Sequence, residues 1–408
     1  MTDERAHDTS SARVLTRQRL LVMCGALLVA LGTSSSGQTP AVDNSPAATA
    51  ARAFNRGQYD QIDSLLGSAT DDRSIALRGR AAVARGRYAD AEKLLSGRAA
   101  TTPAGDSALE LGLLQMYLGR RTEGVRTLTA VLTRGPENTP MDLLRLGRAA
   151  RGLGRFQDAN MFLRDAARLA PQDPAINTEW GEVFLEKYNV ADAVKSFQAA
   201  LEASMDYVPA QIGLARATLD ENPPEARKAA EAALKVNPND VPAHLLLAEL
   251  ALDDRRRDEA RDSIKKALDV NPNSLEARAL DAAIAFLEAR TSDFESIVAG
   301  LLKTNPVYGD AYRVTGDQLG RNYRFDEAEQ MTRKALAKLR RFTFPEQLDN
   351  TLMGTTQTKA QSGVYRHLKE FSAFLVSQKR IKEPIPENVL LDAVEPGPLE
   401  RYLRERKQ

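Results

Sequence analysis

The chain has 408 residues, of which 43% are hydrophobic and 27% are charged, so it carries enough apolar material to fold and is not a disordered chain. Its 56 Lys and Arg residues are balanced by 55 Asp and Glu residues, and the net charge of +1 argues against nucleic acid as a partner. One Cys and three His exclude thiolate zinc sites and disulfide frameworks within one copy, and we predict no metal and no cofactor.

Residues 1–37 have the layout of a secretory signal. Arg13, Arg17 and Arg19 precede an apolar run over residues 20–31, which small polar residues follow. A run of about a dozen residues is shorter than the roughly 20 that cross a bilayer, so we expect cleavage near Gly37 and an exported, periplasmic or extracytoplasmic protein. An uncleaved anchor in the inner membrane, with residues 38–46 as a short linker, stays open, as does lipid attachment at Cys24. Membrane contact would run through this segment alone.

A period of about 34 residues organises the chain from residue 47 onward. Its first mark is a small residue in the middle of an apolar stripe. In most units a second small residue follows about twelve positions later. A Pro ends many of the units. The first mark stands at Gly79, Gly112, Gly147, Gly181, Ala215, Ala248, Ala282 and Gly316. Apolar residues recur every three or four positions on both sides of a central turn, which predicts two amphipathic helices in each unit.

Each mark has a physical cause. A small residue lets two helix backbones approach closely, and the terminal Pro cannot continue a helix. Glycines at the central turn supply the left-handed conformation that ends the first helix, and an aromatic residue two positions later fills the corner of the unit. These glycines are Gly57, Gly86, Gly119 and Gly154, and the aromatic residues include Tyr59, Tyr88 and Phe156. Single units depart from the pattern at Met205, at Phe294 and at the shortened turn over residues 221–224, and we expect altered local geometry there.

This helix-turn-helix unit resembles the tetratricopeptide repeat. We count eight units over about residues 71–341 and a shortened one over 47–70, which assigns residues 47–342 to the array. The resemblance implies an all-α solenoid, a right-handed superhelix whose first helices line a concave groove for an extended peptide or a partner helix. Residues 343–408 are predicted to hold a capping helix over 358–380 and a Pro-punctuated tail.

Motifs for catalysis are missing from the sequence, so we predict that the protein is not an enzyme. His7, His244 and His367 stand alone, and there is no zinc-peptidase helix motif, phosphate-binding loop or nucleophile elbow. His244 is expected to be a capping or surface residue. Trp180 lies on an apolar stripe and is expected to belong to the core.

Projecting the groove of the family onto this chain yields a candidate partner-binding set: Arg73, Arg80, Leu113, Met116, Tyr117, Arg148, Arg151, Glu182, Glu186, Arg216 and Glu249. The early units contribute mainly basic and apolar residues and the middle units acidic ones. A peptide would then place its acidic end on the arginines and its apolar side chains against Met116 and Tyr117. Replacing Arg80, Arg148 and Arg151 together by Glu is expected to abolish capture without changing the melting temperature. The alternative is an ordinary solvated face.

Two hypotheses for function follow. The first is a non-catalytic scaffold or adaptor for a protein or peptide partner. The second is the recognition arm of a zinc-peptidase-like exported protein, because residues 305–313 and 324–328 are similar to repeat segments that precede such domains in some exported bacterial proteins. The residues after Arg340 lack the zinc ligands, so this chain would be a catalytically empty relative. Zinc content and casein hydrolysis would distinguish the two.

Overall fold

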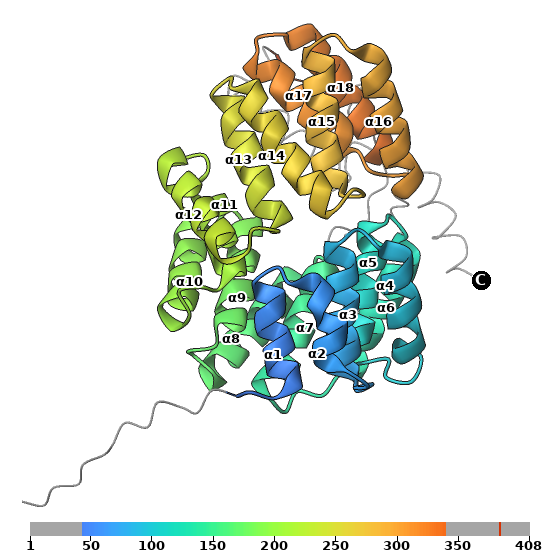
Figure 1. Cartoon of the computed structure of the whole chain (residues 1–408), viewed down its shortest axis with the longest axis vertical. Helices are drawn as coiled ribbons and strands as arrows, with labels where there is room; N and C mark the ends of the chain where they lie inside the picture. The colour runs from blue at the N-terminus through green and yellow to red at the C-terminus, as the bar shows by residue number, and fades with distance from the viewer. Residues whose placement is uncertain (1–42, 340–382, 385–408) are drawn as a thin grey trace, which may run out of the picture. The chain divides into compact units, whose positions relative to one another are not determined.

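The computed structural model describes residues 43–339 and residues 383–384 of the chain. Its described part is all-α, with eighteen α-helices, one short 3-10 helix and no strand, which confirms the predicted all-α solenoid of helix pairs (Figure 1). The predicted leader over 1–37, most of the linker, and the predicted cap and tail over 343–408, apart from residues 383–384, lie outside the described residues.

Nine successive units make up the described array, and in each we call the first helix A and the second helix B. Unit 1 has α1 (Pro46–Asn55), the 3-10 turn Tyr59–Gln61 and α2 (Ile62–Leu66). Units 2 to 5 are α3 (Asp72–Ala84) with α4 (Tyr88–Ala99), α5 (Asp106–Tyr117) with α6 (Arg121–Arg134), α7 (Pro140–Gly152) with α8 (Phe156–Leu169), and α9 (Pro174–Glu186) with α10 (Val190–Ala203). Units 6 to 9 are α11 (Val208–Thr218) with α12 (Pro223–Val236), α13 (Val241–Asp253) with α14 (Arg257–Val270), α15 (Leu275–Leu287) with α16 (Thr291–Thr304), and α17 (Asp310–Arg321) with α18 (Phe325–Leu339).

Local chemistry explains where these helices begin and end. Most A helices start behind a side chain that accepts a hydrogen bond from a free backbone N–H of the first turn. These caps are Ser45, Asp71, Thr139, Asp173, Asp240 and Ser274. A Pro stands two residues beyond the last helical residue of five B helices: Pro136, Pro171, Pro238, Pro272 and Pro306. The predicted stop signals are therefore confirmed.

In units 2 to 5 the small residue of the A helix packs directly on the B helix of the same unit. A Cβ added at Gly79 would lie 2.5 Å from Leu95, and one at Gly147 would lie 2.6 Å from Leu163. The same relation holds between Gly112 and Leu128, and between Gly181 and Phe197. Because each large partner is fully buried, the helices of a unit can approach this closely only with a residue that lacks a bulky side chain.

Unit 9 joins the array in a different way from the others. Phe294 occupies the position where other B helices carry Ala or Gly, and its ring meets the edges of Phe286 at 5.0 Å and Tyr312 at 6.4 Å. Helix α17 packs along α15, whereas the preceding A helices contact the B helix before them extensively. This buried ring thus contacts an aromatic residue of α15 and one of α17. The expected local departure at Phe294 is thus confirmed.

Two other residues singled out in the sequence take structural roles. Trp180 packs against the core cluster of units 4 and 5, and its indole N–H donates to Asn160 Oδ1 over 2.8 Å. His244 is buried, so of its two expected roles the surface one is wrong; its Nε2 lies 2.9 Å from the carbonyl oxygen of Pro238, at the start of α13. That bond ties the start of α13 to the turn before it.

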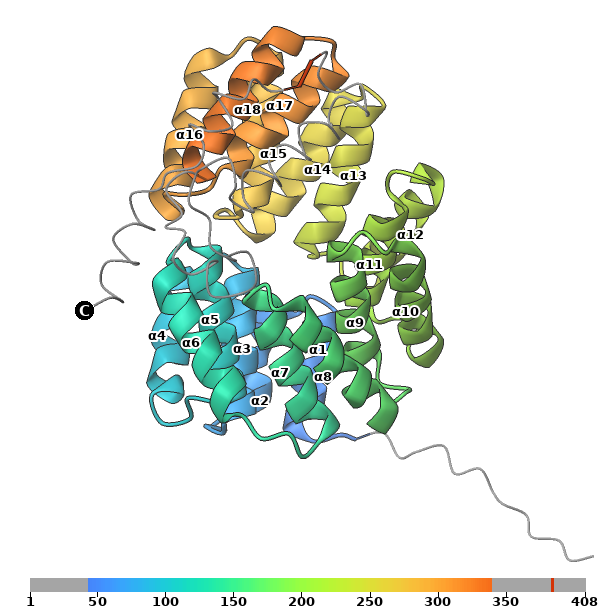
Figure 2. The ribbon, with the colours of Figure 1, turned by 180° about the vertical axis from the view of Figure 1, so that it is seen from behind.

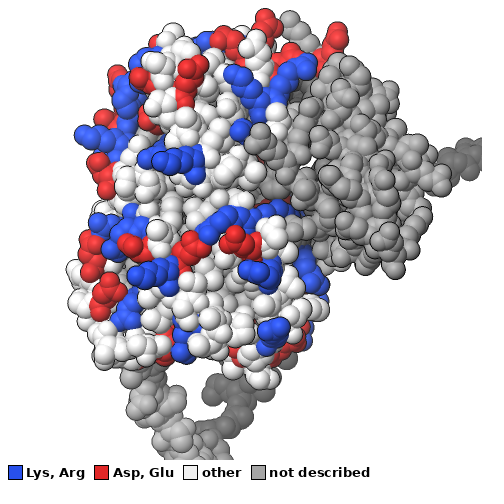
Figure 3. Space-filling model, turned by 90° about the vertical axis from the view of Figure 1, so that its right-hand side faces the viewer, with Lys and Arg blue, Asp and Glu red and all other residues white. Residues whose placement is uncertain are grey.

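The array also closes on itself. Units 1 to 3 and units 7 to 9 face each other in both ribbon views, and hydrogen bonds join residues about 150–190 positions apart in the sequence (Figures 1 and 2). On the face shown in Figure 3, acidic and basic side chains are interspersed among uncharged ones.

Candidate functional site

The first candidate region is this closure, which we call the seam. It consists of the A–B turns of units 1, 2 and 3 and of the inter-unit turns that begin at Asn237, Asn271 and Asn305. Each Asn donates its side-chain amide across the seam: to Tyr59 Oη at 3.1 Å, to Tyr88 Oη at 3.2 Å and to the Tyr117 carbonyl at 2.9 Å. The three contacts form three rungs of one ladder.

The asparagines are held in place by their own turns. Each Oδ1 accepts the backbone N–H two residues later, over 2.9–3.0 Å, which orients the amide N–H toward the opposite unit. In the first two rungs a second Asn strengthens the contact, because Asn239 donates to the carbonyl of Gly57 and Asn273 to that of Gly86, each over 3.0 Å. The third rung has Val307 at this place and lacks that bond.

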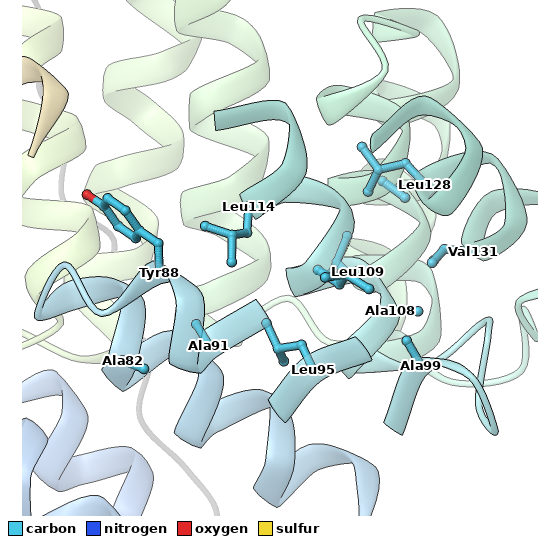
Figure 4. Close-up of a cluster of buried hydrophobic side chains, with 12 residues drawn as sticks. Ala82, Tyr88, Ala91, Leu95, Ala99, Ala108, Leu109, Leu114, Leu128 and Val131 are labelled. Carbon is cyan, nitrogen blue, oxygen red and sulfur yellow. The ribbon is translucent and has the colours of Figure 1, made fainter. Parts of the chain in front are cut away.

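Tyr88 and Tyr117 connect the core of units 2 and 3 to the seam. Tyr88 is buried with Leu95 and Leu109, and Figure 4 shows its hydroxyl pointing away from them. That hydroxyl donates to the Asn273 carbonyl at 3.1 Å. Tyr117 Oη accepts the Leu275 backbone N–H and donates to Glu276 Oε2, both over 3.0 Å. Two aromatic side chains thereby fix unit 8 on units 2 and 3.

The seam requires glycine for close approach. A Cβ on Gly57, Gly86 or Gly119 would come within 1.9, 2.2 and 2.2 Å of the Oδ1 of Asn237, Asn271 and Asn305. Away from the seam, A–B turns with the same left-handed backbone carry Tyr188, Arg255, Ala289 and Tyr323. The backbone conformation alone therefore does not demand glycine, and the opposing Asn does.

The second candidate region is the inner face, formed by charged side chains of the A helices of units 2 to 6. Arg148 Nη1 lies 2.8 Å from Glu110, Arg151 Nη1 2.6 Å from Glu186, and Arg216 Nη1 2.7 Å from Glu182. Arg151 also pairs with Glu179, and Arg80 approaches Glu110 at 3.9 Å. The pairs join different units into one network.

Burial and charge compete within this network. Burial by itself would raise the pKa of Glu110, but the charges of Arg148 and Arg80 outweigh it and hold that pKa below its ordinary value. Burial by itself would lower the pKa of Arg148, but the charges of Glu110 and Glu179 outweigh burial and hold that pKa above its ordinary value. Both groups thus stay charged at neutral pH, and each neutralises the other.

A family model for the tetratricopeptide repeat matches residues 109–174, 144–208 and 220–274. The units within these residues match the tetratricopeptide repeat. Among solved structures, a thermophilic tetratricopeptide-repeat protein from Thermus thermophilus is 22% identical over 44% of this chain and 99% of its own, with a TM-score of 0.40. A tetratricopeptide-repeat protein from Parabacteroides merdae is 17% identical over 57% of this chain and 92% of its own, also with a TM-score of 0.40. No curated protein matches the chain.

The array brings together most of the predicted partner-binding set. Arg80, Arg148, Arg151, Glu182, Glu186 and Arg216 belong to the ion-pair network. Glu249 lies on the A helix of unit 7 and forms no ion pair with the described residues; burial raises its pKa, against the opposing charges of Arg321, Arg313 and Arg216. Arg73 is exposed near the start of α3.

The predicted apolar members lie elsewhere. Leu113 and Met116 are partly buried beside the core of units 2 and 3, with Met116 against Gly124. Tyr117 belongs to the seam. The three therefore do not form an apolar patch separate from the core and the seam.

Two expectations about charge are corrected. The early half of the inner face is not basic, because Glu110 and Glu179 lie between the arginines. Replacing Arg80, Arg148 and Arg151 by Glu would leave those carboxylates among like charges, so it cannot leave stability unchanged. Sequence reasoning missed Glu110 and Glu179, although each lies three residues before a predicted face residue, Leu113 or Glu182.

The part of the chain that the structure describes contains neither a candidate metal site nor a candidate membrane-spanning helix. Among residues 43–339 and 383–384, no group of His, Cys, Asp and Glu is arranged to hold a metal ion. The same residues include no helix long and apolar enough to span a bilayer.

Proposed function

We propose that this tetratricopeptide array is a non-catalytic scaffold that holds a protein or peptide partner against its inner face. Tetratricopeptide-repeat proteins generally mediate protein–protein interactions and are typically non-catalytic. The observation that carries the proposal is the row of arginines and glutamates that units 2 to 6 contribute, because ion pairs between units hold these side chains in fixed positions.

Fixed charges favour recognition. A free Arg or Glu side chain loses up to about 2 kcal/mol of rotamer entropy when it is ordered, and the network has ordered these side chains before a partner arrives. The side chains of Arg80 and Arg216 remain 41% and 44% exposed, so each has donors left for an acidic group of a partner. Glu249, which has no ion pair among the described residues, would take a Lys or Arg of the same partner.

The partner is captured first: the purified chain is added to the envelope fraction and cross-linked chemically to the proteins that bind it. The cross-linked species are then identified. The affinity of that partner is then compared between the wild type, Glu249→Gln and the control Glu202→Gln, which removes an exposed carboxylate from α10. Losing a charge-assisted contact of about 1.5–3 kcal/mol should weaken binding by roughly ten- to a hundredfold in Glu249→Gln alone. Equal affinity of all three proteins would contradict the inner-face assignment.

Extracytoplasmic location is part of the proposal and is supported by the N-terminal sequence, with its arginines, short apolar run and small residues. Cell fractionation and N-terminal sequencing of the mature protein test it. A mature chain that begins near residue 38 in the extracytoplasmic fraction is expected. A full-length chain in the cytoplasmic fraction would contradict it.

A further inference from the structure

The first rung of the seam contains a carboxyl group, Asp240. It caps helix α13, where one oxygen accepts the Ala243 backbone N–H at 2.9 Å, and the other lies 3.4 Å from Asn237 Nδ2. The same turn packs on Gly57 and Tyr59 of unit 1 through Asn237 and Asn239. No cation forms an ion pair with Asp240 among residues 43–339 and 383–384. Its partly buried carboxylate therefore shares the Asn237 amide with the Tyr59 hydroxyl of unit 1 and has no compensating cation among the described residues.

Equivalent caps elsewhere in the array lie in different surroundings. Asp71 caps α3 away from the seam, and hydrogen bonds from Ser74 hold its pKa below the ordinary value. Asp240 performs the same local task, yet burial raises its pKa to about 6. The caps of the second and third rungs are Ser274 and Gly309, which do not ionise. Only the first of the three rungs has a cap that titrates.

The neighbours of Asp240 do not supply the missing cation. Burial raises the pKa of Tyr59 to about 12, so its hydroxyl stays neutral at physiological pH. Burial lowers the pKa of His244, whose ring is bonded to the Pro238 carbonyl. The remaining charges act on those two neighbours: Arg80 on Tyr59 and Lys266 on His244.

We propose that the seam is a proton-dependent latch, in which uptake of one proton by Asp240 favours closure of unit 1 on unit 7 and loss of that proton favours opening. The proton converts the carboxylate to a carboxylic acid, which still accepts the Ala243 N–H through its second oxygen. Closure therefore removes a neutral group from water at low pH but a charged one at high pH.

The sign follows from linkage. A carboxyl group whose pKa is higher in the closed state than in the open state binds protons more tightly when the seam is closed. Protonation therefore favours closure fully below the open-state pKa. This stabilisation of the closed state is lost as pH rises through the closed-state pKa. With a closed-state pKa of about 6, the closing equilibrium weakens by up to about tenfold between pH 5 and pH 8. This inference concerns the closure alone and does not depend on the proposed function.

Two backbone amides report on closure directly. Val208 N–H donates to Asn55 Oδ1 over 3.1 Å, between unit 6 and unit 1 beside the first rung, and Leu275 N–H donates to Tyr117 Oη over 3.0 Å across the seam. Their hydrogen exchange is measured by mass spectrometry in the full-length chain at pH 5 and pH 8. The variant Asp240→Asn keeps a good helix cap that cannot ionise, and Asp71→Asn is the matched control. Dividing by the Asp240→Asn rate at the same pH cancels the intrinsic pH dependence of exchange.

The two amides are expected to exchange faster in the wild type than in Asp240→Asn, and the ratio of the two rates should be up to about tenfold larger at pH 8 than at pH 5. Asp71→Asn should behave as the wild type does. The variant Asn271→Ala, which removes the second rung, should expose Leu275 at both pH values. Equal rates in wild type and Asp240→Asn at pH 8, or the same change in Asp71→Asn, would each overturn the latch.

Discussion

The seam joins units far apart in the sequence and the inner face joins neighbouring units, and the two regions use different chemistry. Neutral amides, hydroxyls and carbonyls make the three rungs of the seam, whereas arginines and glutamates make the inner face. Neutral hydrogen bonds require donor and acceptor to approach closely, so the seam requires glycine at the turns that the opposing Asn side chains contact. An ion pair needs both of its charges, so removing one residue of the inner face leaves the charge of its partner without compensation. The difference predicts how each region fails.

Removing Arg148 should have the largest effect. The variant Arg148→Ala leaves Glu110 with only the more distant Arg80 as a cation, and it removes one of the arginines that pair with Glu179. Removing one partner of a buried ion pair costs about 3–5 kcal/mol of stability. Urea unfolding measures the loss of stability. Arg73→Ala, at an exposed position of the same predicted set, is the control and should change stability by less than about 0.5 kcal/mol. Similar losses in both variants would mean that the network does not stabilise the array.

Gly86→Ala should come next and tests the close approach at the seam. Ala adds a Cβ 2.2 Å from Asn271 Oδ1 and also requires a left-handed backbone, so the combined cost is expected to be about 3 kcal/mol. Gly154→Ala has the same backbone requirement, with φ +71°, but its Cβ would meet nothing closer than the Phe156 ring at 4.0 Å. It should cost about 1 kcal/mol in the same unfolding experiment. Equal costs would show that backbone conformation, and not the opposing Asn, selects glycine.

The repeat period was predictable because its causes lie within one unit. Gly79 and Leu95 are sixteen residues apart and lie on the two helices of a single hairpin, so a window of 34 residues contains the whole interaction. The seam joins Tyr59 to Asn237, and no local pattern states that these two turns meet. A signal did exist, since glycines recur in the early turns and Asn-Pro recurs in the late ones. For the inner face, residue positions predicted which charges share a face but not which of them pair.

Asn271→Ala should separate closure from local packing. It removes the amide that reaches Tyr88 and the Oδ1 that accepts the Asn273 N–H, at a cost of about 1–3 kcal/mol. Asn177→Ala removes a comparable bond inside unit 5, where the amide donates to the Pro171 carbonyl over 2.9 Å. Small-angle X-ray scattering should show a larger radius of gyration for Asn271→Ala and no change for Asn177→Ala. If neither variant expands, the other two rungs suffice to keep the seam closed.

Glu249→Gln should have the smallest effect and the opposite sign. Burial raises the pKa of Glu249, so its stabilising contribution is present at low pH and is lost as pH rises through the folded-state value. At pH 7 the amide replaces a charge that burial disfavours, and the unfolding free energy should increase by less than about 1 kcal/mol. At pH 4, where the carboxyl is largely protonated, the two proteins should unfold at the same urea concentration. A loss of stability at pH 7 would mean that Arg321, Arg313 and Arg216 hold the carboxylate more strongly than burial opposes it, and that Glu249 is already satisfied within the chain.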